Sequence, residues 1–178
     1  MKANNFKSLI ILLSIFCLGL TLCHAQNAEE RLKQLGIDLP QPEAPTANFV
    51  LAVKVGNLVF LSGHGPVMPD GEFMTGKVGS ELTLEQGNEA ARLTGISLLS
   101  SLKAEIGSLN RVKRIVKVLG MVNAVPDFDQ HPQVMNGFSD FMVEVFGEKG
   151  KHARSAVGMG SLPHNIPVEI EMIVELVE

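Results

Sequence analysis

Apolar and polar residues alternate along the last stretch of the chain. The apolar positions are Val168, Ile170, Met172, Val174 and Leu176, and the residues between them are Glu169, Glu171, Ile173 and Glu175. Because successive side chains of a strand point to opposite faces, this period of two predicts a strand with one apolar and one mostly acidic face.

Further apolar runs predict the other strands of a sheet. Residues 49–55 and 58–62 flank the turn dipeptide Gly56-Asn57, which favours a hairpin. Residues 72–78 predict a short strand, residues 111–122 form a run rich in Val and Ile, and residues 153–158 precede a segment with turn signals at Gly160, Pro163, Asn165 and Pro167.

Two stretches have the spacing of amphipathic helices. Thr83 and Gln86 form a capping box, the stripe that follows consists of Leu93, Ile96, Leu99, Leu102 and Ile106, and Gly107 ends it. Residues 127–146 carry a second stripe of Met135, Phe138, Met142 and Val145. The order of elements predicts an α+β fold with a mixed sheet and both helices on one face.

The N-terminal residues have the pattern of a targeting segment. Lys2 and Lys7 precede an apolar run over residues 9–22, and Ala25 occupies the position expected just before a cleavage site. The run is short for a membrane span. We therefore expect a signal peptide over residues 1–25, export to the periplasm or the medium, and no membrane insertion after cleavage. A lipid anchor on Cys23 is the alternative, disfavoured by the large Leu22 before it.

The rest of the chain divides into a short N-terminal part and one domain. Residues 27–36 predict a short helix, and Pro40, Pro42 and Pro45 follow as an extended linker. We assign residues 26–45 to this helix and linker and residues 46–178 to a single domain, a length that can bury a sizeable core.

The net charge and the positions of the cysteines exclude some classes of function. Without residues 1–25, which contain two lysines and no acidic residue, 13 basic and 19 acidic side chains remain, a net charge of −6. An acidic domain is a poor candidate for binding nucleic acid. Cys17 and Cys23 both lie in the targeting segment, so the remaining chain has no disulfide, thiol nucleophile or cysteine-ligated metal. The basic cluster from Arg111 to Lys117 is most simply a solvated strand end that balances the acidic last strand.

Arg154 is the strongest candidate for chemistry. Ala156 and Gly158 share its strand face, and such small neighbours leave volume around a cation whose planar fork binds a carboxylate through two hydrogen bonds. The alternative is an arginine at a strand edge that pairs with a glutamate. His64 stands between two glycines as a candidate pocket residue, and the alternative there is a plain loop histidine.

Three segments together resemble the Rid family, the reactive intermediate deaminases, also called YjgF-type or L-PSP endoribonucleases. The segments are residues 56–63 (Gly-Asn-Leu-Val-Phe-Leu-Ser-Gly), residues 122–128 (Val-Asn-Ala-Val-Pro-Asp-Phe), and the C-terminal set Ala153-Arg-Ser-Ala-Val, Leu162-Pro and Val168-Glu-Ile-Glu. They occur in the family's order and span the chain from about residue 44 to its end.

The resemblance implies a fold, an assembly and an activity. It implies a chorismate-mutase-like fold and a homotrimer with ligand clefts between the subunits. The reaction it implies is hydrolysis of a 2-imino acid to a 2-keto acid and ammonia, with no metal or organic cofactor, because a protonated imine is already a good electrophile. The partner implied is a small carboxylate, and no nucleic acid.

The resemblance also implies roles for particular residues. Arg154 falls on the family's carboxylate-binding arginine, and Glu169 falls on its acidic residue near the water, although Glu169 is alternatively one more solvated carboxylate. The family's substrate-binding positions fall on Ser62, Gly63, Asn136 and Ala156. Many members of the family have Cys at the position of Ala156.

Phe49 is the main departure from the family pattern. The archetypal deaminases have Tyr here, and this chain contains no Tyr. The lost hydroxyl costs on the order of 1 kcal/mol in hydrogen bonding. Three hypotheses follow: an imine deaminase, a non-catalytic trimeric protein that binds small carboxylates, and, as a distant third, a ribonuclease, for which the acidic chain offers little stacking or basic surface.

Overall fold

A five-stranded mixed sheet forms the centre of the fold. The computed structural model describes residues 27–178. The strands are β1 Ala52–Val55, β2 Leu58–His64, β3 Val112–Asn123, β4 Ala153–Met159 and β5 Val168–Leu176. Their order across the sheet is β1-β2-β5-β3-β4, with β3 and β4 parallel and the other neighbouring pairs antiparallel. Strand β4 is therefore an edge strand.

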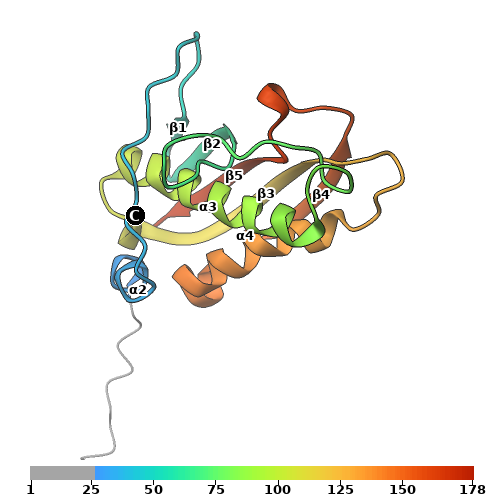
Figure 1. Cartoon of the computed structure of the whole chain (residues 1–178). Helices are drawn as coiled ribbons and strands as arrows, with labels where there is room; N and C mark the ends of the chain where they lie inside the picture. The colour runs from blue at the N-terminus through green and yellow to red at the C-terminus, as the bar shows by residue number, and fades with distance from the viewer. Residues whose placement is uncertain (1–26) are drawn as a thin grey trace, which may run out of the picture.

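Two long helices cover one face of this sheet (Figure 1). They are α3, Leu84–Ile106, and α4, His131–Phe146. Short 3-10 turns follow α3 at Leu109–Arg111, follow α4 at Gly147–Gly150, and precede β5 at Pro163–Asn165. The predicted fold class, an α+β sheet with two helices packed on one face, is confirmed.

The alternation of buried residues defines two faces of the sheet. On β5, every apolar position of the predicted alternation is buried, beneath the helices. We call this side the helix-covered face. The opposite side, the open face, carries Phe60, Met121, Val157, Glu169 and Ile173. The predicted strand with one apolar and one acidic face is thus confirmed.

The helices begin and end close to the predicted positions. Thr83 and Gln86 form the predicted capping box, with the Thr83 hydroxyl accepting from the Gln86 N–H at 3.2 Å and the Gln86 side chain accepting from the Thr83 N–H at 2.9 Å. Of the α3 stripe, Leu93 and Ile96 are only half-buried. The whole α4 stripe is buried, but the helix starts at His131 rather than residue 127, because Pro132 occupies the first turn.

One predicted strand is wrong. Residues 72–78 form no strand, only isolated bridges at Phe73 and Val78. Gly76 has φ 129°, which is incompatible with an extended strand, so the alternation in this segment does not continue into a ladder. The first strand is shorter than predicted, and the exposed residues Phe49 and Val50 lie before it.

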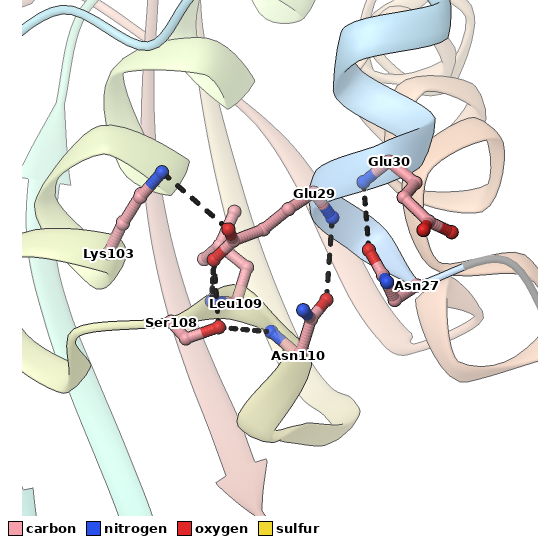
Figure 2. Close-up of polar contacts among 7 residues, drawn as sticks. All are labelled: Asn27, Glu29, Glu30, Lys103, Ser108, Leu109 and Asn110. Atoms are coloured by element: carbon pink, nitrogen blue, oxygen red, sulfur yellow. Dashed lines mark hydrogen bonds and ion pairs between the residues drawn. The ribbon is translucent and has the colours of Figure 1, made fainter.

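The predicted N-terminal helix exists and packs onto the core. Helix α2, Ala28–Gln34, buries Ala28 and Leu32. Figure 2 shows the hydrogen bonds that hold its first turn against the segment after α3. The Glu29 carboxylate accepts from the Ser108 hydroxyl at 2.8 Å and from the Leu109 N–H at 3.1 Å. The helix that precedes the proline-rich segment therefore contributes to the hydrophobic core of the domain.

The targeting segment predicted over residues 1–25 lies outside the described residues. From residue 27 onward, no helix is both long and apolar enough to cross a bilayer. The signal peptide, the export and the lipid-anchor alternative at Cys23 remain predictions.

Candidate functional site

Arg154 is held against helix α4 by hydrogen bonds to neutral oxygens. It lies on the helix-covered face of β4, beside Val118 of β3. Its Nη1 donates to the Asn136 side-chain oxygen at 3.1 Å and to the Ser139 hydroxyl at 2.9 Å, and its Nη2 donates to the Pro132 carbonyl at 3.3 Å. The predicted proximity of Arg154 and Asn136 is thus present in the fold.

No carboxylate of residues 27–178 lies in direct contact with the Arg154 guanidinium. Within residues 27–178 the guanidinium takes part in no ion pair, so the alternative of an arginine paired to a glutamate does not hold. Burial lowers the pKa of Arg154, and the nearby charge of Asp140 opposes that shift. Of the five N–H donors of a guanidinium, three are used by these oxygens and two remain. Two donors are what a carboxylate needs.

An open cavity of about 370 Å³ adjoins this guanidinium. Arg154, Asn136, Ser139, Asp140 and Lys151 contribute to its lining. The cavity lies between α4 and the beginning of β4. A small anion inside it would reach Arg154 from solvent.

The small residues beside Arg154 have a different role from the predicted one. Ala156 is half-buried against the core, and a Cβ on Gly158 would overlap the His131 imidazole. The volume above Gly158 is thus occupied by a side chain of α4. These small residues allow the helix to approach the edge strand.

Glu169 lies on the open face beside Gly63. A Cβ on Gly63 would overlap the Glu169 carboxylate, so glycine at this position lets the carboxylate lie directly against the β2 backbone. Gly63 lies where the pairing of β2 with β5 shifts register, between Leu61 and His64. Sequence reasoning assigns both residues to the site, and the structure brings them into contact.

Burial, and secondarily the charge of Glu171, raise the pKa of Glu169. The folded state therefore holds the Glu169 proton more tightly than the unfolded chain does. Wild-type stability should decrease as pH rises from the ordinary glutamate range through the folded-state pKa. We expect Glu169→Gln to melt at a higher temperature than wild type at pH 7, with the difference vanishing near about pH 4.

Thermal unfolding of both proteins across this pH range measures the effect. The matched control is Glu105→Gln, an exposed glutamate on α3. Equal differences for the two variants at every pH would contradict the special environment of Glu169.

The remaining candidates have defined places. The Ser62 hydroxyl donates to the Leu51 carbonyl at 3.2 Å. Phe49, whose side chain is 54% exposed, precedes β1. His64 is a buried strand residue rather than a loop residue: one ring nitrogen contacts the Ser62 carbonyl at 2.7 Å and the other contacts the Ser101 hydroxyl at 2.8 Å. His64 is therefore a structural histidine.

Arg154 and Glu169 belong to opposite faces of the sheet within one chain. Arg154 aligns with Val118, and Val118 aligns with Met172 on the helix-covered face. Glu169 aligns with Met121, three residues from Val118 and hence on the other face. One copy of the chain does not bring the two residues together.

A family model described as "YjgF/chorismate_mutase-like, putative endoribonuclease" matches residues 29–176. The chain belongs to the Rid (YjgF) family. The match begins within α2 and ends at the last residue of β5, so it spans the described fold almost completely. Membership confirms the resemblance that the three sequence segments indicated.

Relatives of this Rid-family chain cover nearly its whole folded part. Protein TCP17 of Trypanosoma cruzi is 43% identical over 82% of this chain and 91% of its own length. A 2-iminobutanoate/2-iminopropanoate deaminase of Dermatophagoides farinae is 31% identical over 76% of this chain and 88% of its own. The crystal structure of Atu1372, an Agrobacterium tumefaciens protein of unknown function, is similar with TM-score 0.77 and 41% identity over 84% of this chain and 94% of that one.

Sequence reasoning missed two residues around the arginine of this Rid-family chain. They are Ser139, whose hydroxyl oxygen accepts from Arg154 Nη1 at 2.9 Å, and His152, whose Nε2 lies 3.1 Å from the same hydroxyl. Both residues could have been found from their spacing: Ser139 stands three positions after Asn136 on one helix face, and His152 stands two positions before Arg154, just ahead of β4.

Metal ligation has no candidate in the described part of this Rid-family chain. Among residues 27–178 no group of three or more His, Cys, Asp or Glu side chains is placed to hold a metal ion.

Proposed function

We propose that this protein is a hydrolytic deaminase of 2-imino acids. Water adds to the carbon of the protonated imine, the carbon–nitrogen bond breaks, and a 2-keto acid and ammonia leave. Arg154 binds the substrate carboxylate, and Glu169 positions and deprotonates the water. The 31% identity to a mite protein named as such a deaminase supports this proposal.

The environment of Arg154 carries the proposal. Its guanidinium is anchored by Asn136, Ser139 and Pro132, retains two N–H donors and adjoins an open cavity. A cation that is fixed but not neutralised binds a carboxylate at a low cost in side-chain entropy. This arrangement supports a ligand that carries one carboxylate group.

Glu169 has the properties of a base for water. Burial raises its pKa, which brings its protonation equilibrium closer to neutral pH. General bases work best when their pKa lies near the operating pH. Its carboxylate accepts no hydrogen bond from residues 27–178 within the chain, so a water molecule can approach it.

A complete site requires two copies, because Arg154 and Glu169 occupy opposite faces of one sheet. We propose a homotrimer with clefts between subunits. The open face supports such an assembly: Val53, Phe60 and Val157 are exposed by 50%, 42% and 39%. Val53 and Phe60 are neighbours in the pairing of β1 with β2, and large apolar side chains exposed together on a sheet face are typical of interfaces.

Imine hydrolysis by the purified protein tests the proposed function. An amino-acid oxidase with catalase generates 2-iminopropanoate and related imines in the cuvette, and semicarbazide reports the imine that remains. We expect faster loss of imine than the spontaneous rate. No acceleration across several imines would exclude the deaminase.

Mixing two inactive variants should restore part of the activity. Arg154→Ala and Glu169→Gln chains, when co-expressed, form clefts in which one copy supplies Arg154 and its neighbour supplies Glu169. Random assembly into a cyclic trimer gives such clefts at about a quarter of the positions, so we expect about a quarter of wild-type activity. The imine assay measures it, with each variant alone as the control.

An inactive mixture of the same oligomeric mass as wild type would contradict a site shared between copies. Each variant's mass, measured by light scattering, shows that assembly itself is intact. Imine hydrolysis by either variant alone would also contradict the shared site, because neither homotrimer has a cleft with both Arg154 and Glu169.

Phe49 favours a second candidate function, a non-catalytic protein that binds small carboxylates. The phenyl ring keeps the apolar surface of the position but supplies no hydroxyl for ligand or water. For such a binding protein, Arg154→Ala would abolish carboxylate binding, whereas Glu169→Gln would alter no rate. The imine assay distinguishes the two functions.

A further inference from the structure

The Ser139 hydroxyl lies between a guanidinium and an imidazole. Its oxygen is 2.9 Å from Arg154 Nη1 and 3.1 Å from His152 Nε2. The other ring nitrogen, Nδ1 of His152, is 2.7 Å from the Gly150 carbonyl oxygen. These four residues form a continuous chain of hydrogen bonds.

The two ends of this chain fix its direction. A guanidinium only donates, so the Ser139 oxygen accepts from Arg154. A carbonyl oxygen only accepts, so Nδ1 of His152 carries a hydrogen and donates it to Gly150. In the neutral imidazole Nε2 is then bare, and it accepts the Ser139 hydroxyl hydrogen. One assignment of the hydrogens satisfies every member.

We propose that Ser139 and His152 are positioning residues for Arg154, joined in a one-directional relay from the guanidinium through the hydroxyl and the imidazole to the Gly150 carbonyl. The relay rests on the proposed role of Arg154 as the carboxylate-binding group. The relay restricts the orientation of the Arg154 side chain, which lies on an exposed edge strand, so that its guanidinium stays in one position.

Packing holds both ends of the relay in place. A Cβ on Gly150 would overlap the Met142 carbonyl, so this segment lies directly against α4. The His152 ring packs edge-on against Phe138, with ring centroids 5.8 Å apart. Since Ser139 also belongs to α4, the relay connects this helix to the beginning of the edge strand β4, where Arg154 lies.

The relay needs a neutral His152. Burial lowers the pKa of His152, the charge of Arg154 lowers it further, and the hydrogen bond to Gly150 opposes them. The charged groups that line the cavity beside it are Arg154, Lys151 and Asp140. Protonation of His152 would reverse the hydrogen bond between Ser139 and His152. Nε2 would then carry a hydrogen and donate it to the Ser139 hydroxyl oxygen, instead of accepting from that hydroxyl.

Nitrogen-15 NMR of the imidazole tests the direction of the relay without any ligand. In wild type at neutral or slightly alkaline pH, we expect the Nδ1–H tautomer of His152, the less common one in free histidine. In Ser139→Ala, the Nε2 resonance should move toward that of an unprotonated nitrogen without a hydrogen bond. Finding the Nε2–H tautomer in wild type would overturn the relay.

Hydrogen exchange at Arg154 Nη1, the nitrogen that donates to Ser139, tests the positioning. Ser139→Ala should exchange about fivefold faster than wild type, the factor that loss of one hydrogen bond of ordinary strength gives. Ser139→Thr keeps the hydroxyl and should restore the wild-type rate. The control is Ser97→Ala, a half-buried helix serine whose hydroxyl donates to the Leu93 carbonyl at 3.3 Å. An unchanged Arg154 rate in Ser139→Ala would overturn the positioning role.

Binding of 2-oxobutanoate, a 2-keto acid, connects the relay to the proposed function. Ser139→Ala should bind it about fivefold more weakly than wild type, with Ser139→Thr restored. Failure of wild type to bind 2-oxobutanoate would count against the proposed function alone, because the tautomer and the exchange rate decide the relay without a ligand.

Discussion

Arg154→Ala should strongly weaken carboxylate binding and imine hydrolysis together. The wild-type guanidinium offers two N–H donors to a carboxylate, and each charge-assisted hydrogen bond contributes about 1.5 kcal/mol or more. Loss of both weakens binding by about 100-fold. Calorimetric titration with 2-oxobutanoate measures the affinity, and the semicarbazide assay measures the rate.

Lys151→Ala is the matched control for Arg154→Ala. Lys151 lines the same cavity, but its side chain is 64% exposed and pairs with Glu148 at 2.7 Å. An exposed, screened cation contributes little, so this variant should keep binding within about twofold. Equal losses in both variants would show that the net charge of the cavity, rather than the geometry of Arg154, binds the ligand.

The fold was predictable because long amphipathic patterns dominate it. The alternation along β5 and the stripe of α4 match the buried residues, and the capping box at Thr83 marks the start of α3. The predicted strand over residues 72–78 failed for a local reason. A short alternation does not reveal the backbone of Gly76, and its φ of 129° prevents a ladder.

The site was predictable only in part. Resemblance to the Rid family pointed to Arg154, Asn136, Glu169 and Gly63, and the structure joins them in two pairs rather than one cluster. Periodicity within one segment says nothing about how distant segments align, so the opposite faces of Arg154 and Glu169 became visible only from the register of β3 with β4 and β5.

Gly137→Ala should destabilise the fold strongly. Gly137 lies on α4 where it approaches α3, and a Cβ there would overlap the Asn88 backbone carbonyl oxygen. The Asn88 side chain also donates to the Gln133 carbonyl at 2.9 Å, which holds the two helices close together. Because backbone cannot rotate away, the helices must separate, at a cost of about 3 kcal/mol. Denaturant unfolding measures the loss, and the melting temperature should fall by about 10 °C.

Gly160→Ala is the control for Gly137→Ala. A Cβ on Gly160 would meet no atom within 4 Å, and its φ lies outside the left-handed region. We expect a change in unfolding free energy within about 0.5 kcal/mol. Both variants must be compared at one protein concentration, because assembly between copies adds concentration-dependent stability. A Gly137→Ala protein as stable as Gly160→Ala would mean that α3 and α4 can separate without cost, and the close contact of these helices would then contribute nothing to the stability of the fold.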